Sequence, residues 1–164
     1  MDPVAKVVVK ESAKTIKNLI DGWNFFLNHE VVVGITEETN GARKDGEGNA
    51  ALLYKNEKGS PIDHIPARPV LKPAIAQPQV QEKISTLFRD AAEAALVFGN
   101  REKCEQCFEK AGMIGRDACK KYITDGTNLA PNAPLTILRK GSSKPLIDTG
   151  SMLNAITYAV RRKK

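Results

Sequence analysis

Apolar residues recur at steps of three and four along three long segments, and this spacing limits the fold more than any other feature of the chain. The first stripe consists of Ile16, Leu19, Ile20, Trp23, Phe26 and Leu27. The second consists of Ile75, Val80, Ile84, Leu87, Phe88, Ala91, Ala95 and Leu96, and the third of Cys104, Cys107, Phe108, Ala111, Ile114, Ala118, Cys119 and Tyr122. Residues three and four apart share one face of an α-helix. The pattern therefore predicts three helices, over residues 1–30, from Ala74 to Gly99, and over about 102–123, each with its stripe in the core.

Residues typical of helix ends support these limits. Asp2 and Pro3 indicate a helix start, because Asp2 can accept from free amides and Pro3 needs no amide partner there. Asn100 and Gly126 lie where the second and third helices are expected to stop.

Two short segments have the composition of β-strands. Residues 31–35 read VVVGI, and residues 156–160 alternate apolar side chains with others. We expect the final strand, 156–160, to pair with residues 31–35. Residues 36–48 are rich in Glu, Gly, Asn and Asp and are expected to form an exposed loop.

Two further segments contain several glycines and prolines. A brief helix over residues 50–54 is expected to stop at Gly59, and Pro66, Pro69 and Pro73 predict an extended segment. Residues 139–150 are predicted to form a loop. There the side-chain oxygens of Asp148 and Thr149 can cap a short helix that begins near Gly150.

The chain has 164 residues, of which 41% are hydrophobic and 27% charged, so it can bury one core. The element order predicts an α+β fold in which a small antiparallel sheet is covered by several α-helices, with long exposed loops and a single domain over residues 1–164. So small a sheet leaves open edges, which a neighbouring subunit can cover. No run of eighteen apolar residues occurs, so we expect no membrane partner.

The net charge of +6 is concentrated near the carboxy terminus. Residues 125–164 hold seven Lys or Arg against two Asp, and four of these cations form the basic tail 161–164. Such a run is either a solvated end or a contact for nucleic-acid phosphates.

Cys104 and Cys107 have the C-x-x-C spacing of zinc and thiol–disulfide sites. Both cysteines, and Cys119, also fall on the apolar face of the third predicted helix, and no second C-x-x-C pair is present. Buried free thiols are therefore the preferred interpretation, and a zinc site completed by His29 or His64 is the alternative.

Candidate catalytic groups are scattered. His64 follows Asp63 and lies near Glu57, and Ser142 and Ser143 could act as nucleophiles, but no spacing joins them in a triad. The G-x-S-x-G elbow and the phosphate-binding G-x-x-x-x-G-K-[ST] loop are both missing. We therefore expect neither a hydrolase nor a nucleotide enzyme.

Arg68 lies between Pro66 and Pro69, which stiffen its backbone. A fixed guanidinium suits two roles, an internal clamp on carboxylates or carbonyls and a subunit contact. The sequence leaves both open.

Two runs resemble one protein family. The first run consists of residues 56–59, NEKG, followed by residues 65–74, IPARPVLKPA, and the second run is residues 139–156, RKGSSKPLIDTGSMLNAI. They are similar to the "NEFG…IPARPFLRPA" and "RKGSSKPLIDTGQLLNSI" segments of the tail-completion or neck proteins of tailed bacteriophages. Lys58 and Val70 stand where the family has phenylalanine.

The resemblance implies a structural virion protein and not an enzyme. It would complete the head-proximal end of the tail and help join the tail to the head, as a ring of six or twelve copies beside neighbouring neck, connector and tail proteins. No cofactor or metal is expected. The protein would be made in the host cytoplasm and end in the neck of the virion. The candidate assembly residues are Asn56, Glu57, Gly59, Pro66, Arg68, Pro69, Lys140, Pro145, Leu146, Asp148, Thr149 and Gly150.

A DNA-binding protein is the alternative function. It would contact DNA non-specifically through residues 139–144 and 161–164, although this region lacks stacking aromatic residues and a recognition helix.

Overall fold

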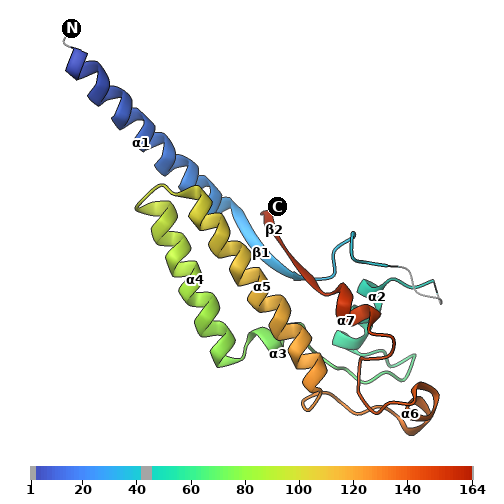
Figure 1. Ribbon diagram of the computed structural model, residues 1–164. Helices are drawn as coiled ribbons and strands as arrows, with labels where there is room; N and C mark the ends of the chain where they lie inside the picture. Colours follow the sequence, from blue (N-terminus) through green and yellow to red (C-terminus); the bar gives the residue numbers. More distant parts are fainter. Residues whose placement is uncertain (1–2, 42–45, 164) are drawn as a thin grey trace. The chain divides into compact units, whose positions relative to one another are not determined.

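The computed structural model describes residues 3–41 and 46–163. Its elements in chain order are α1 (Pro3–Asn28), β1 (His29–Gly34), α2 (Asn49–Lys58), α3 (Leu71–Ile75), α4 (Pro78–Leu96), α5 (Arg101–Asp125), α6 (Pro134–Lys140), α7 (Ser151–Ala155) and β2 (Thr157–Arg162) (Figure 1). The predicted α+β class is confirmed. The helix start predicted at Asp2 lies outside the described residues.

β1 and β2 pair in a two-stranded antiparallel sheet. At one end of the pair the Lys163 amide donates to the Asn28 carbonyl at 2.7 Å, and the Arg161 side chain reaches Glu30. The predicted pairing of the last strand with the first is confirmed. β2 is longer than predicted, so Arg161 and Arg162 belong to the strand and not to a basic tail.

Two glycines let α5 approach the sheet closely. A Cβ at Gly115 would lie 2.9 Å from Val33 Cγ2, and a Cβ at Gly112 would overlap the ring of Tyr158. The guanidinium of Arg116 lies 5.7 Å from the centre of that ring, within the range of a cation–π contact. Small residues on α5 therefore make room for side chains from both strands.

Contacts group the chain into two compact units, which we describe separately. Unit 1 contains the described parts of Met1–Val31, Glu82–Ala111 and Val160–Lys164, and unit 2 contains those of Val32–Gln81 and Gly112–Ala159. That residues 1–164 act as one domain stays a prediction.

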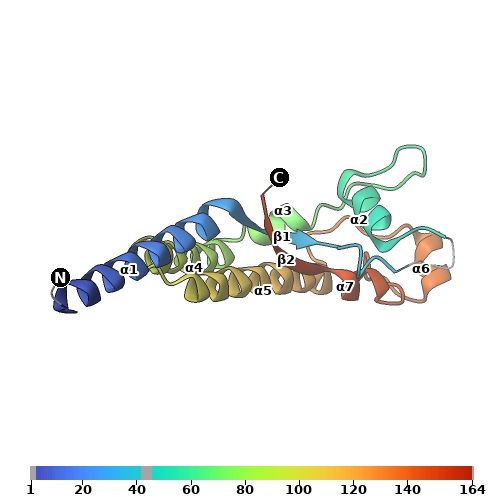
Figure 2. The same ribbon diagram turned by 90° about the horizontal axis from the view of Figure 1, so that it is seen from above.

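Unit 1 has an aromatic core. α4 and α5 are joined by a short loop and run side by side in opposite directions (Figure 1 and Figure 2). The Phe108 ring packs against Phe25, Phe26 and Phe88, with ring centres 5.6, 5.9 and 5.1 Å away. Ala91, Ala95 and the buried thiols of Cys104 and Cys107 complete the cluster.

The predicted core stripe of α1 was wrong for four of its six residues. Ile16, Ile20, Trp23 and Leu27 are about half exposed, and the helix instead buries the face that carries Gly22 and Phe25. The reason is the size of Gly22, at which a Cβ would lie only 2.7 Å from the Ala95 carbonyl oxygen. The close approach of the α1 and α4 backbones at Gly22 therefore decides which face of α1 is buried. Apolar spacing alone does not reveal this face.

Unit 2 has an aliphatic core. It contains Leu53, Val70, Ala74, Cys119, Ile123, Leu129, Met152 and Ile156, drawn from α2, α3, α5, α7 and the loops between them. Much of this unit is irregular chain, so side-chain hydrogen bonds to the backbone have a large part in fixing it.

Several predicted boundaries were wrong around this core. The segment expected to be extended through Pro73 is free of regular helix only up to Val70. α3 follows, with Pro73 as its third residue, where a missing amide costs no helical bond. The helix expected from Ala74 begins only at Pro78. Lys140, expected in a loop, ends the short helix α6.

Candidate functional site

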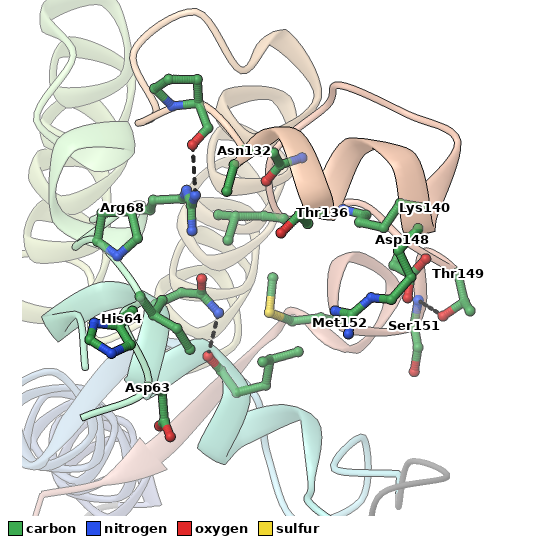
Figure 3. A pocket seen from close by; sticks show the side chains of 18 of the residues that line it. Asp63, His64, Arg68, Asn132, Thr136, Lys140, Asp148, Thr149, Ser151 and Met152 are labelled. Atoms are coloured by element: carbon green, nitrogen blue, oxygen red, sulfur yellow. Dashed lines mark hydrogen bonds between the residues drawn. The ribbon is translucent and has the colours of Figure 1, made fainter. Parts of the chain in front are cut away.

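The two runs that carry the family resemblance meet at one pocket in unit 2. The pocket has a volume of about 610 Å³ and is open to solvent (Figure 3). Three segments line it, one from α2 to Arg68, one around α6, and one from Leu146 to Met152. Eight of the twelve candidate assembly residues are in this lining, namely Asn56, Pro66, Arg68, Lys140, Leu146, Asp148, Thr149 and Gly150.

Arg68 is the most buried charged residue at this pocket, with 8% of its surface exposed. Its Nε donates to the Ala130 carbonyl at 2.7 Å, and its Nη2 donates to the Pro131 carbonyl at 2.9 Å. Figure 3 draws the second of these bonds as a dashed line from Arg68. Burial lowers the pKa of the guanidinium. The predicted internal clamp is confirmed, with backbone carbonyls as its acceptors. The alternative role as a subunit contact stays a prediction.

The Asn56 and Glu57 pair holds the same segment from the other side. The Asn56 carbonyl accepts from the Arg68 amide at 2.6 Å, and its side-chain Nδ2 donates to Leu52. The Glu57 carboxylate accepts from the amides of Val70 and Leu71, at 2.7 Å each, and so caps the start of α3. Glu57 is thus a structural cap and not part of an acid–base cluster with His64.

Gly59, Pro66 and Pro69 shape the chain between these contacts. Gly59 caps the end of α2 with a φ of 75°, as predicted for a helix stop. Pro66 borders the pocket, whereas Pro69 is exposed and lies outside the lining.

Lys140 and Asp148 place charge at the opposite wall of the pocket. Burial lowers the pKa of Lys140, and nearby Asp148 acts in the opposite direction. Arg68 and Arg139 lower it further. Arg68, Arg139 and Lys140 therefore border this pocket as three cations. The two arginines repel the charged form of Lys140, which is why they lower its pKa.

The loop before α7 turns as the sequence predicted, with one correction. Gly150 has a φ of 78°, in the left-handed region that favours glycine. The Ser151 amide donates to Thr149 Oγ1 at 3.3 Å, and no capping hydrogen bond comes from Asp148. Gly150 therefore occupies the N-cap position, and Thr149 supplies the side-chain oxygen that accepts from the first amide of α7. Of the remaining candidates, Pro145 is buried and Leu146 has a φ of 60°.

Sequence reasoning missed Asn132, which connects the two runs. Its Nδ2 donates to the Ser143 carbonyl at 3.3 Å and to the Lys144 carbonyl at 3.1 Å. Asn132 follows Pro131, one of the two residues held by Arg68. The pattern Pro-Asn-Ala-Pro is typical of a turn and is the signal that could have identified it.

Several polar groups in and beside the pocket form internal hydrogen bonds. Ser151 Oγ donates to Asn49 Oδ1 at 3.2 Å, and Ser60 Oγ donates to Asp63 at 2.8 Å. Within residues 3–41 and 46–163, no serine or cysteine is hydrogen-bonded to a histidine, and no three His, Cys, Asp or Glu side chains gather as metal ligands.

The cysteines are buried, as the sequence predicted, in separate units. Cys104 and Cys107 belong to the core of unit 1, and Cys119 belongs to that of unit 2. Burial raises the pKa of the Cys104 thiol to about 11 and that of Cys119 to about 12. These thiols therefore stay protonated at neutral pH, which opposes the thiolate form that zinc binding and redox exchange require.

Internal contacts engage two cations of the carboxy-terminal run. Arg161 forms an ion pair with Glu30 at 2.9 Å, and Lys163 Nζ donates to the Leu27 carbonyl at 2.8 Å. Lys164 lies outside the described residues. Among the described helices, none combines the length and apolar character that crossing a membrane requires.

No protein-family model, curated protein or solved structure matches this chain.

Proposed function

We propose that this protein is a structural component of the neck of a tailed bacteriophage, where it completes the head-proximal end of the tail and helps join tail to head. In this role it assembles with copies of itself as a ring beside neighbouring connector and tail proteins. It works without catalysis or a cofactor. It is made in the host cytoplasm and becomes part of the virion.

One observation carries the proposal, namely that the two family-like runs form one continuous structure. Arg68 in the first run holds residues 130 and 131, and Asn132, the next residue, holds residues 143 and 144 in the second run. Segments more than sixty residues apart are thus tied together through backbone carbonyls. This use of polar side chains supports a scaffold that presents a fixed surface, because the same groups are not left free for catalysis.

The direct test is deletion of the gene from the phage or prophage that encodes it, followed by electron microscopy of the lysate. We expect DNA-filled heads and separate tails, and joined virions when the wild-type gene is restored. Joined virions in normal number without the gene would contradict the proposal.

DNA binding is tested separately with the purified protein. Phosphate contacts would give an affinity that falls steeply with salt. Arg161 and Lys163 are already bonded internally, so we expect weak binding that Arg161→Ala does not alter. Tight, salt-sensitive binding that depends on Arg161 would favour the DNA-binding alternative.

A further inference from the structure

Unit 1 exposes a row of large apolar side chains that its own core does not use. Ile16, Ile20, Trp23 and Leu27 follow one another on α1 at steps of four, three and four residues, which places them on one stripe of the helix. Val97 and Phe98 lie in the loop after α4, and the Trp23 Nε1 donates to the neighbouring Leu96 carbonyl at 3.2 Å. We call these six residues the α1 stripe, after the four of them that lie on α1.

The α1 stripe is larger than the chance exposure of single apolar residues. Its members are 49–67% exposed, which leaves roughly 600 Å² of apolar surface, since an aromatic side chain carries about 150–250 Å² and an aliphatic one somewhat less. That equals or exceeds the largest apolar patch of a typical monomer, about 300–600 Å². The stripe also lies apart from the buried face of α1, which carries Gly22 and Phe25. α1 therefore has two apolar faces, of which unit 1 covers one.

We propose that the α1 stripe is the contact surface for the same stripe of a second copy of this chain, with the two α1 helices antiparallel. Two copies would remove roughly 1,200 Å² of apolar surface from water, which reaches the lower limit of stable protein interfaces at about 1,200–2,000 Å². The inference is independent of the neck function, because it depends only on the surface of unit 1.

The spacing of the stripe favours the antiparallel orientation. Steps of four, three and four read the same in both directions, so reversal sets Ile16 against the partner's Leu27 and Ile20 against the partner's Trp23. Antiparallel pairing also brings Lys17 to the carboxyl end of the partner's α1, where the helix dipole favours a cation. Parallel pairing would instead bring the lysines of the two helices together, at a cost from like-charge repulsion.

The first experiment measures the mass of the purified full chain by sedimentation equilibrium over a range of concentrations. We expect a dimer that Ile20→Asp dissociates by at least about 100-fold, because two carboxylates would be buried opposite apolar groups. Leu135→Asp is the matched control, since Leu135 is 78% exposed but lies in unit 2. It should leave the dimer intact. Far-UV circular dichroism checks that both variants keep their helices.

Cysteine cross-linking tests the orientation. A mixture of Ile16→Cys and Leu27→Cys proteins should form a disulfide-linked heterodimer, whereas Ile16→Cys alone should not. In the antiparallel pair the two copies of residue 16 are roughly 16 Å apart along the helix, beyond the reach of a disulfide. The native cysteines are at most 7% exposed and should not compete.

Four results would overturn the proposal. The first is a wild-type chain that stays monomeric at about 100 µM, a concentration well above the micromolar dissociation constants at the weak end of standard-size interfaces. The second is an Ile20→Asp variant that dimerises as wild type does. The third is an Ile16→Cys protein that cross-links to itself. The fourth is a monomer that sediments with phosphatidylglycerol vesicles in a Trp23-dependent way, which would identify the stripe as a membrane-binding surface.

Discussion

The two units of this protein are stabilised in different ways. In unit 1, four phenylalanine rings and small residues pack between long helices, and the stability comes chiefly from apolar burial. In unit 2, short helices and loops are held by single side chains that bond to the backbone, above all Arg68 and Glu57. The residues that resemble a phage family therefore support an irregular scaffold in unit 2, whereas apolar periodicity describes the long helices.

The largest effect is expected at the centre of unit 1. Phe108→Ala should lower the free energy of unfolding by about 3–5 kcal/mol, because the ring contacts three other phenylalanines and its loss leaves a cavity. Urea unfolding measures the change. Lys83→Ala, at an exposed position of α4, is the control and should stay within about 0.5 kcal/mol of wild type. A loss below about 1 kcal/mol for Phe108→Ala would mean that the aromatic cluster does not stabilise the fold.

The second effect tests the polar clamp of unit 2. Arg68→Met should cost about 2–4 kcal/mol, because two charge-assisted hydrogen bonds are lost and the carbonyls of Ala130 and Pro131 lose their donor. Arg68→Lys should restore little, since an ammonium lacks the planar fork. Arg139→Met, on the same pocket but exposed, is the matched control. Equal thermal stability of the Arg68→Met and Arg139→Met proteins would refute the clamp.

A smaller effect is expected at the turn before α7. Gly150→Val should cost about 1–3 kcal/mol, because valine resists a φ of 78°. Thr149→Ala should cost about 0.5–1 kcal/mol through the lost cap, and Asp148→Ala less, since the capping oxygen belongs to Thr149. Chemical denaturation ranks the three variants. A larger loss for Asp148→Ala than for Thr149→Ala would restore Asp148 as the cap.

If unit 2 presents an assembly surface, phage that carry Gly150→Val should also leave separate heads and tails in electron micrographs of the lysate. Gly34→Ala is a suitable control, since nothing lies within 4 Å of the added methyl group. Normal numbers of joined virions from Gly150→Val would mean that the conformation of this turn is not required for assembly.

The smallest effect concerns Trp23. The apolar stripe in the sequence predicts a buried ring and a loss of about 3–5 kcal/mol for Trp23→Ala. The ring is 49% exposed and donates one hydrogen bond to Leu96, so we expect about 1 kcal/mol for the dilute monomer. Urea unfolding at low and high protein concentration separates the loss of stability within the monomer from any loss caused by weaker association. A loss above about 3 kcal/mol at low concentration would show that Trp23 belongs to the core.

Periodicity was sufficient for the long elements. It predicted α4, α5 and the last strand because these residues repeat with the period of their structure, whereas the β-branched composition of residues 31–35 predicted the first strand. It did not choose the buried face of α1, since both faces are apolar and the choice depends on Gly22 meeting Ala95. That contact joins segments distant in sequence, so no local pattern contains it.

The candidate site was predicted through its motif residues but not through its bonds. Arg68 and Gly150 were identified because prolines and glycine constrain the backbone in a way that sequence shows. α3 and α6 were missed because helices this short depend on a cap or on packing, such as the Glu57 carboxylate at the start of α3. The bridge through Asn132 depends on partners that only the folded chain brings together.

Hydrogen exchange on the Arg68→Met variant tests most directly the claim that the family-like residues hold unit 2 together. Protection of the Val70, Leu71 and Leu129 amides should fall markedly relative to wild type, because the clamp and the Glu57 cap hold the same segment. Amides of α4 in unit 1 should keep their protection. Unchanged protection in unit 2, or an equal loss in both units, would contradict the account.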